Sequence, residues 1–153
     1  MPVISKSALL MVPVQTAYDV VVDVAVYPLF VPACRAVQII SQPSDLELTA
    51  SVTVGGSVGG RSIEETFVTH NQHKPGERVD MSLNQGPFER LEGHWQFTRL
   101  SDEGCKVELI IEYEPRGMLA RILSKLAEPM ANRLVDAFSQ RIEGVWAEQQ
   151  TRG

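Results

Sequence analysis

Two side chains of this sequence combine a titratable group with a position that a folded chain would turn inward. Glu65 alternates with Ile63 and Phe67, so a strand over this stretch places all three on one face. A carboxylate buried there without a partner is costly, and a hydrogen bond to a bound carbonyl or hydroxyl group would offset that cost. The alternative is that Glu65 faces water at an open end of the sheet, or that an arginine pairs with it. Tyr113 is the second candidate for acid–base chemistry, but no spacing links it to Glu65, and we predict no catalytic residue.

The histidines and cysteines do not form a metal-ligand pattern. His70 and His73 are three residues apart, so on a strand they face opposite sides, and His94 falls on the polar face of its strand. Cys34 and Cys105 are too few and too far apart for a zinc site or a disulfide framework, and we expect both to be reduced and packed. The chain also lacks a Gly-x-Ser-x-Gly turn, a phosphate loop and a dinucleotide-binding glycine pattern. We therefore predict no metal, no cofactor and no enzymatic activity.

Charge is unevenly distributed along the chain. Of its 153 residues, 14 are Lys or Arg and 19 are Asp or Glu, and the net charge of −5 argues against DNA as a partner. From residue 116 onward, six basic and four acidic residues give +2, whereas the earlier part carries −7. Arg116, Arg121 and Lys125 gather near the start of the last helical segment, with the second and third one turn apart. We predict that any surface that binds phosphates or anionic lipids uses these residues; a solvated helix face is the alternative.

Most of the chain alternates between apolar and polar residues, which predicts strands joined by short turns and paired as antiparallel neighbours. A short helix is expected over residues 16–24. The segment from Tyr27 to Cys34 contains two prolines and reads as a loop or a single helical turn, and the glycine-rich run 55–60 as a flexible hairpin connection. The predicted strands cover residues 3–11, 36–41, 48–54, 63–70, 79–84, 91–97 and 107–114.

The periodicity becomes helical after Pro115. From Met118 to about Gln149, apolar residues form one stripe, and Pro129 lies inside it and should kink or break the helix. A sheet with one apolar face and a helix with one apolar stripe must bury these surfaces on each other. We therefore predict the α+β class. One domain over residues 1–153 would consist of a curved antiparallel sheet of about six to seven strands wrapped around a long C-terminal helix.

Small and aromatic side chains on the inner face of this sheet predict a cavity. After the turn Gly86-Pro87, the residues Leu91, Gly93, Trp95 and Phe97 fall at every second position, and Gly93 removes a side chain from the inner face. Such a cavity would be mainly apolar with few polar groups, which suits a hydrophobic ligand. A fully packed core is the alternative.

The sequence contains neither a predicted membrane span nor a signal peptide. No apolar run reaches about 18 residues. Met1 to Val14 lacks a basic segment followed by an apolar core and a small-residue cleavage site. We therefore expect a cytoplasmic protein, with at most a peripheral and transient contact to the inner membrane.

Three segments together resemble the START-like, helix-grip superfamily, and within it the coenzyme Q-binding (polyketide cyclase/dehydrase-like) family. They are Tyr27-Pro28-Leu29-Phe30-Val31-Pro32-Ala33-Cys34, Ile63-Glu64-Glu65-Thr66-Phe67, and Gly86-Pro87-Phe88 through Gly93-His94-Trp95-Gln96-Phe97. The resemblance covers residues 5–146 and is closer to the bacterial branch of ribosome-association toxins (RatA). The chain departs from that branch at Ala33, where bacterial members often have glycine before the cysteine.

The resemblance implies a hydrophobic pocket under the long helix that binds ubiquinone or a similar polyprenyl lipid, as a ligand rather than a cofactor. It also implies a role as a quinone carrier or chaperone in respiration. Tyr27, Phe30 and Val31 would form a gate, and core packing is the alternative for every aromatic candidate. The implied ligand-binding residues are Tyr27, Phe30, Val31, Glu65, Phe67, Phe88, Trp95, Phe97, Leu119, Ile122 and Leu126.

The resemblance leaves two other functions open. Some bacterial members are described as binding the large (50S) ribosomal subunit and blocking subunit association, and here Arg116, Arg121 and Lys125 would meet RNA phosphates. A polyketide cyclase/dehydrase-like enzyme is the third hypothesis, and it would need a carboxylate, His or Tyr beside the substrate. The carrier and ribosome hypotheses use different surfaces and do not exclude each other.

Overall fold

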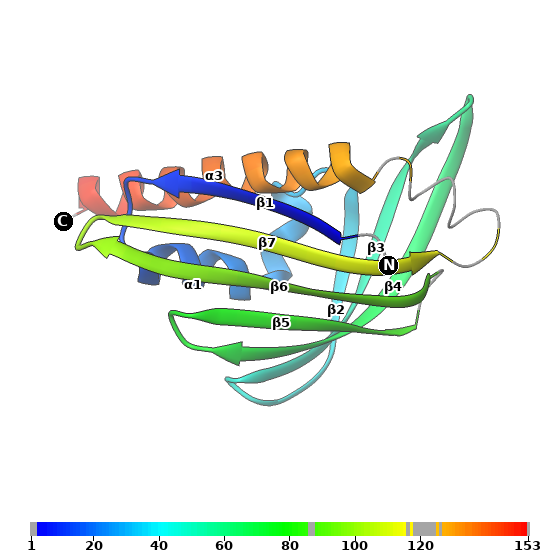
Figure 1. Ribbon diagram of the computed structural model, residues 1–153, viewed down its shortest axis with the longest axis horizontal. Coiled ribbons are helices and arrows are strands. Elements are labelled where there is room, and N and C mark those ends of the chain that lie inside the picture. Colours follow the sequence, from blue (N-terminus) through cyan, green and yellow to red (C-terminus); the bar gives the residue numbers. More distant parts are fainter. Residues whose placement is uncertain (1–2, 86–87, 116, 118–124, 126, 153) are drawn as a thin grey trace.

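The computed structural model describes residues 3–85, 88–115, 117, 125 and 127–152 (Figure 1). Two short helices follow the first strand, six strands come next, and a long helix ends the chain. In order, the elements are β1 (Val3–Leu10), α1 (Val14–Val22), the 3-10 helix η1 (Val24–Leu29), β2 (Cys34–Ser44), β3 (Glu47–Val58), β4 (Arg61–Lys74), β5 (Arg78–Gln85), β6 (Phe88–Ser101), β7 (Gly104–Pro115) and α3 (Ala127–Arg152).

The seven strands form one antiparallel sheet in the order β1-β7-β6-β5-β4-β3-β2. Each strand pairs with its neighbour in sequence except β1, which closes one edge against β7. Figure 1 shows the strands curving around the side of the sheet on which α1 and α3 lie. The predicted α+β class, with a curved antiparallel sheet and a C-terminal helix, is confirmed.

The main core lies between the inner face of β5, β6, β7 and β1 and the two helices. Alternation turns Trp95 and Phe97 of β6 and Val107 and Leu109 of β7 inward, where they meet α1 and α3. Each of these four side chains is at most 5% exposed. The buried members of this core are Leu10, Val12, Ala17, Tyr18, Val20, Val21, Val79, Trp95, Phe97, Cys105, Val107, Leu109, Val135, Phe138 and Ile142.

The connection between β3 and β4 is shorter than the sequence predicts. Gly55 and Gly56 belong to β3, where they pair with Glu64 and Ile63 of β4. The turn itself is Gly59-Gly60, whose φ values of 57° and 79° are those that a two-residue hairpin turn demands. The prediction of a flexible run over residues 55–60 is therefore wrong for its first half, because ladder hydrogen bonds override the low strand propensity of glycine.

The helix α3 extends without a break from Ala127 to Arg152. Pro129 lies near the start of this segment, and the helix continues through it. Of the predicted helical residues 118–126, only Lys125 is among the described residues, and it is helical. The break that Pro129 predicts therefore does not occur within Ala127–Arg152.

The edge strand β2 is irregular. Its pairing with β3 shifts register between Cys34 and Ala36 and twice more toward its end, beyond Ile39. Pro43 lies in the last part of the strand and has no N–H to donate. Ile39 and Ile40 remain 42% and 55% exposed.

The segment before β2 contains a strained residue. Ala33 has a φ of +63°, a left-handed conformation that L-residues other than glycine rarely adopt. It is held there by its neighbours, since the carbonyl of Ala33 accepts a hydrogen bond from the Gly55 N–H at 2.9 Å and Cys34 beside it is buried.

We expect Ala33→Gly to stabilise the protein. Relief of the left-handed strain should exceed the extra chain entropy of glycine by about 0.5–1 kcal/mol. Thermal unfolding should then show a rise in Tm of about 1–4 °C. The matched control is Ala36→Gly, in the exposed part of β2, which should lower Tm. A lower Tm for the Ala33 variant would contradict the strain.

Candidate functional site

An aromatic cluster joins the long helix, the 3-10 segment and the sheet. Phe138 of α3 lies at its centre, with ring centroids 5.2 Å from Tyr27, 5.0 Å from Phe30 and 4.8 Å from Trp95. Tyr27 and Phe30 also meet edge to face at 5.9 Å. The structure therefore brings together three of the predicted site residues, and Val31 packs against the same core.

Tyr27 is fixed by a hydrogen bond as well as by packing. Its hydroxyl donates to the backbone carbonyl of Val21, at the end of α1. Burial raises the pKa of Tyr27 above its ordinary value, and the carboxylate of Asp23 raises it further. The phenol is consequently a neutral donor throughout the physiological pH range. Next to it, the guanidinium of Arg141 stands 5.5 Å from the centroid of Phe30, a cation–π distance.

Trp95 and Phe97 lie in the packed part of the core. They are 4% and 5% exposed, and the ring of Phe97 meets that of Tyr18 edge to face at 5.7 Å. A substitution at either position would therefore lower the stability of the fold, whether or not a ligand binds nearby. At this end of the sheet, the two aromatic side chains are surrounded by other core residues, as the alternative of a fully packed core predicts.

A second apolar surface occupies the other end of the inner face, and we call it the concave apolar surface. Buried Tyr113 forms its centre, at 7% exposure, and partly buried side chains surround it. These side chains come from five different strands: Ile4, Phe67, Leu83, Leu91 and Ile111. Tyr113 and the main core form two clusters that share Ile111, so the inner face has one closely packed end and one half-covered end.

Glu65 borders the concave apolar surface. It is half-buried on β4, two residues from Phe67 and directly opposite Val54 of β3. Among the residues that the structure describes, none forms an ion pair with Glu65. A carboxylate on a half-covered apolar surface is a polar group that could fix the orientation of a ligand.

Gly93 serves close packing. A Cβ at this position would stand 3.1 Å from the backbone oxygen of Ile110, and 3.5 Å from side-chain carbons of Ile111 and Met81. Any larger residue would have to push the β6–β7 ladder apart, because the closest atom belongs to the backbone. The missing side chain thus allows two neighbours to approach each other across the strand.

Several predicted site residues lie outside the described part of the chain. Leu119, Ile122, Leu126, Arg116 and Arg121 are among them. The backbone of Phe88 is described as the first residue of β6, but its side chain is not. Lys125 is described as an exposed residue.

The histidines are arranged as the strand periodicity predicts, on opposite faces of β4. His70 is on the outer face, with Nε2 2.9 Å from a Glu47 carboxylate oxygen and Nδ1 3.0 Å from the Thr49 hydroxyl. It borders an outer hollow of about 320 Å³ together with His94, whose pKa is lowered mainly by burial. His73 is on the inner face, near α1. No group of three or more His, Cys, Asp or Glu among the described residues could hold a metal ion.

Both cysteines are free and buried, as expected from their number and spacing. Burial raises the pKa of the Cys34 thiol and of the Cys105 thiol. Neither sulfur is therefore an activated nucleophile.

Sequence reasoning missed one polar residue of the inner face. Asn71 continues the alternation of Ile63, Glu65 and Phe67 along β4, so the strand pattern itself could have identified it. It is 5% exposed, and its Oδ1 has no hydrogen-bond partner among the residues that the structure describes. His73, two residues further on, also has a buried nitrogen, Nε2, without a partner.

The fold and the inner face define the class of protein. A seven-stranded curved sheet with a long C-terminal helix over its inner side is the START-like, helix-grip arrangement, and solved structures agree. An aromatase/cyclase from Streptomyces superposes with a TM-score of 0.82, 16% identity and coverage of 93% of both chains. A START superfamily protein from Mycobacterium smegmatis gives a TM-score of 0.76, with 21% identity over 94% of this chain and 98% of that chain.

The chain belongs to the family described as polyketide cyclase / dehydrase and lipid transport, whose model matches residues 10–143. A curated relative is the ribosome association toxin RatA of Pseudomonas aeruginosa. It is 37% identical over 144 residues, which make up 94% of this chain and 96% of the relative. The resemblance that the three sequence segments carry is therefore confirmed at the level of the family.

No helix within the described residues is long and apolar enough to cross a membrane.

We expect Tyr27→Phe to lower stability, because the carbonyl of Val21 loses its donor while the aromatic packing stays. The loss should be about 1 kcal/mol in urea unfolding at pH 7. The raised pKa of Tyr27 adds a pH signature. A phenol whose folded pKa exceeds its unfolded value contributes stability that is complete below about pH 10 and is lost as the pH rises further. Above pH 10, the variant should consequently lose stability less steeply than the wild type.

The control for this experiment is Tyr18→Phe, which removes a hydroxyl from another buried tyrosine of the same core. No hydrogen bond of the Tyr18 hydroxyl occurs among the described residues. Equal stability losses for the two variants at pH 7 would contradict the role of the Tyr27–Val21 hydrogen bond.

Proposed function

We propose that this protein binds a hydrophobic ligand against the concave apolar surface and carries it. The observation behind this proposal is the second cluster itself. Phe67, Leu83 and Leu91 remain only partly buried although their strands lie in the middle of the sheet. Half-buried apolar side chains on a concave surface, with a few polar groups nearby, are typical of a site for a small apolar molecule.

The ligand class we propose is ubiquinone or a similar polyprenyl lipid. The family description includes lipid transport, which supports an apolar ligand. Glu65 supports a ligand with a polar end, because it lies beside Phe67 without an ion-pair partner in the described part of the chain. Tyr27, Phe30 and Val31 would act as a gate, since η1 connects α1 to the edge strand β2. We propose that the carrier acts as one domain in the cytoplasm and touches the inner membrane transiently.

An enzymatic role is the least supported hypothesis. The aromatase/cyclase from Streptomyces shares the fold at 16% identity, which says nothing about chemistry. Tyr113 is buried among apolar side chains, and Glu65 lies on the rim of the same surface. We therefore propose a binding protein rather than a cyclase.

Organic extraction of the purified protein followed by mass spectrometry tests the carrier proposal. The expected result is a polyprenyl quinone, or another apolar lipid, at close to one molecule per chain. Titration of the extracted protein with ubiquinone should restore the bound form. An empty extract combined with no binding on titration would overturn the proposal.

A pair of leucine variants locates the ligand. Leu83→Gln places an amide on the concave apolar surface, where desolvation without a partner should weaken ligand affinity about tenfold. Leu100→Gln introduces the same change at a 58% exposed position at the end of β6 and should leave affinity unchanged. Equal affinities of the two variants would place the ligand elsewhere. Thermal unfolding of both variants separates a binding effect from loss of fold.

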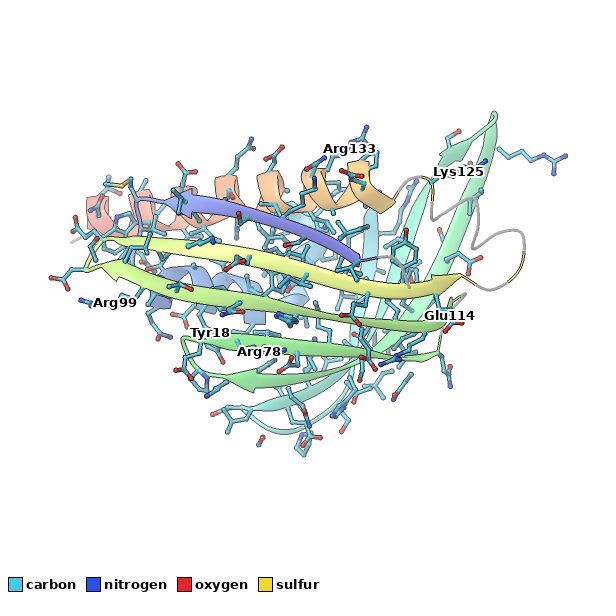
Figure 2. The ribbon with its side chains drawn as sticks, in the orientation of Figure 1. Tyr18, Arg78, Arg99, Glu114, Lys125 and Arg133 are labelled. Atoms are coloured by element: carbon cyan, nitrogen blue, oxygen red, sulfur yellow. The ribbon has the colours of Figure 1, made fainter. Side chains whose placement is uncertain are left out.

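Association with the large ribosomal subunit is a second proposal, and the curated relatives favour it. The RatA relative from P. aeruginosa aligns over nearly the whole of both chains. The basic residues at the start of the helix would then meet ribosomal RNA, and Lys125 and Arg133 are exposed among the described residues. Figure 2 labels both toward the N-terminal end of α3. This surface differs from the concave apolar surface.

Cosedimentation with purified large subunits tests the ribosome proposal. Binding should weaken steeply with salt, because contacts to phosphates release counterions. Lys125→Glu combined with Arg133→Glu should abolish cosedimentation at moderate salt. Lys74→Glu is the control, since Lys74 is exposed on β4 and pairs with Glu77 at 3.1 Å. A double variant that still sediments with the subunit would remove this surface from consideration.

A further inference from the structure

Asn71 is an unusual residue for the inner face of this sheet. It is 5% exposed, and alternation along β4 places it between Leu48 of β3 and Met81 of β5. Leu48 is itself buried, and Met81 packs against the main core. Within the described part of the chain, Oδ1 of Asn71 has no hydrogen-bond partner in these surroundings. Native proteins pair almost all of their buried polar atoms, so an unpaired one points to a missing partner.

His73 presents a second unpaired atom on the same face. Its Nδ1 lies 3.1 Å from the backbone carbonyl oxygen of Asp45. A carbonyl can only accept, so Nδ1 carries the proton, and Nε2 of the neutral ring is left as an acceptor. That Nε2 is buried and has no partner among the described residues. Two residues with unpaired acceptors therefore lie on one face of β4, two positions apart, which corresponds to about 6.7 Å of backbone along the strand.

A hollow of about 330 Å³ opens at His73. Its walls come from α1, through Tyr18 and Val22, and from the turn between β2 and β3, through Asp45 and Leu46. Its volume is about ten times the share of one water molecule in the liquid, so an organic group can enter. Asn71 lies two residues further along β4, between His73 and Phe67, which is the β4 member of the concave apolar surface.

The polar residues of the outer hollow behave differently. Arg78 and Asp80 form an ion pair there at 2.8 Å, and His70 is bonded to both Glu47 and Thr49. Those groups are satisfied by the protein itself. The two inner acceptors have no such partners among the described residues. A leucine at position 71 would fit the apolar neighbours and would avoid the free-energy cost of burying an unpaired polar atom.

We propose that Asn71 Oδ1 and His73 Nε2 form a polar subsite that accepts hydrogen bonds from a hydroxyl-bearing apolar ligand, such as an alcohol, a phenol or a hydroquinone. This inference rests on the proposed ligand-binding function and specifies the ligand's polar end. A hydroxyl donates one hydrogen bond, so an alcohol or a phenol supplies the donor that one of the two acceptors lacks, and a hydroquinone carries a second hydroxyl for the other. A quinone carbonyl or a methyl ether only accepts, and would leave both atoms unpaired. Within the quinone class, the subsite therefore selects the reduced form.

The test uses 2-naphthol and 2-methoxynaphthalene, which share a ring system and differ in the donor. Isothermal titration of the full chain should give 2-naphthol an affinity at least about fivefold higher, the effect of one hydrogen bond. The one hydroxyl of 2-naphthol donates to one acceptor at a time. Each of Asn71→Leu and His73→Phe should therefore narrow the difference between the two affinities, and the double variant should remove it. Asn71→Leu should also raise the Tm of the ligand-free protein, because an unpaired buried acceptor is removed.

The control is Asn84→Leu, at an exposed position of β5, which should leave the preference unchanged. Equal binding of both probes to the wild type would overturn the subsite and leave the hydrophobic site standing. Binding of neither probe would overturn both proposals. A fall in Tm for Asn71→Leu, with the preference retained, would mean that a buried water satisfies Oδ1, and would also overturn the subsite.

Discussion

The contact of Phe138 with Trp95, Tyr27 and Phe30 is the interaction on which the rest of the structure depends. It ties α3 to the inner face of β6, and it ties η1, and through it the start of β2, to both. Aromatic side chains bury large areas and have preferred contact geometries, so the contacts of Phe138 with three other rings fix the angle between helix and sheet. The position of the helix decides in turn how much of the inner face is covered.

One curved face therefore has two ends with different properties. At the Phe138 end, Trp95 and Phe97 are packed and contribute stability. At the Tyr113 end, Phe67 and Leu83 are only partly buried. The RatA relative resembles this chain in sequence and the aromatase/cyclase neighbour resembles it in fold, while their names point to different activities. The fold by itself therefore does not decide the function, which depends on the surfaces that the chain presents.

Alternation was sufficient to predict the strands, because each strand has one face on the core and one in water. It also predicted correctly that His70 and His73 lie on opposite sides of β4. It could not separate the two ends of the inner face, since Trp95 and Phe67 carry the same pattern while their burial depends on a helix far away in sequence. Asn71 was overlooked because a polar residue in an alternating strand reads as an outward position unless its parity is counted.

The irregular edge strand has a consequence for behaviour at high concentration. An open sheet leaves the outer side of β2 without a neighbour, and Ile39 and Ile40 are exposed there. A straight, apolar edge would recruit a strand from another molecule and start a fibril. The register shifts and Pro43 interrupt the row of donors that such a recruit needs. The bulges thus allow two exposed isoleucines to remain on an edge strand without a continuous row of donors and acceptors beside them.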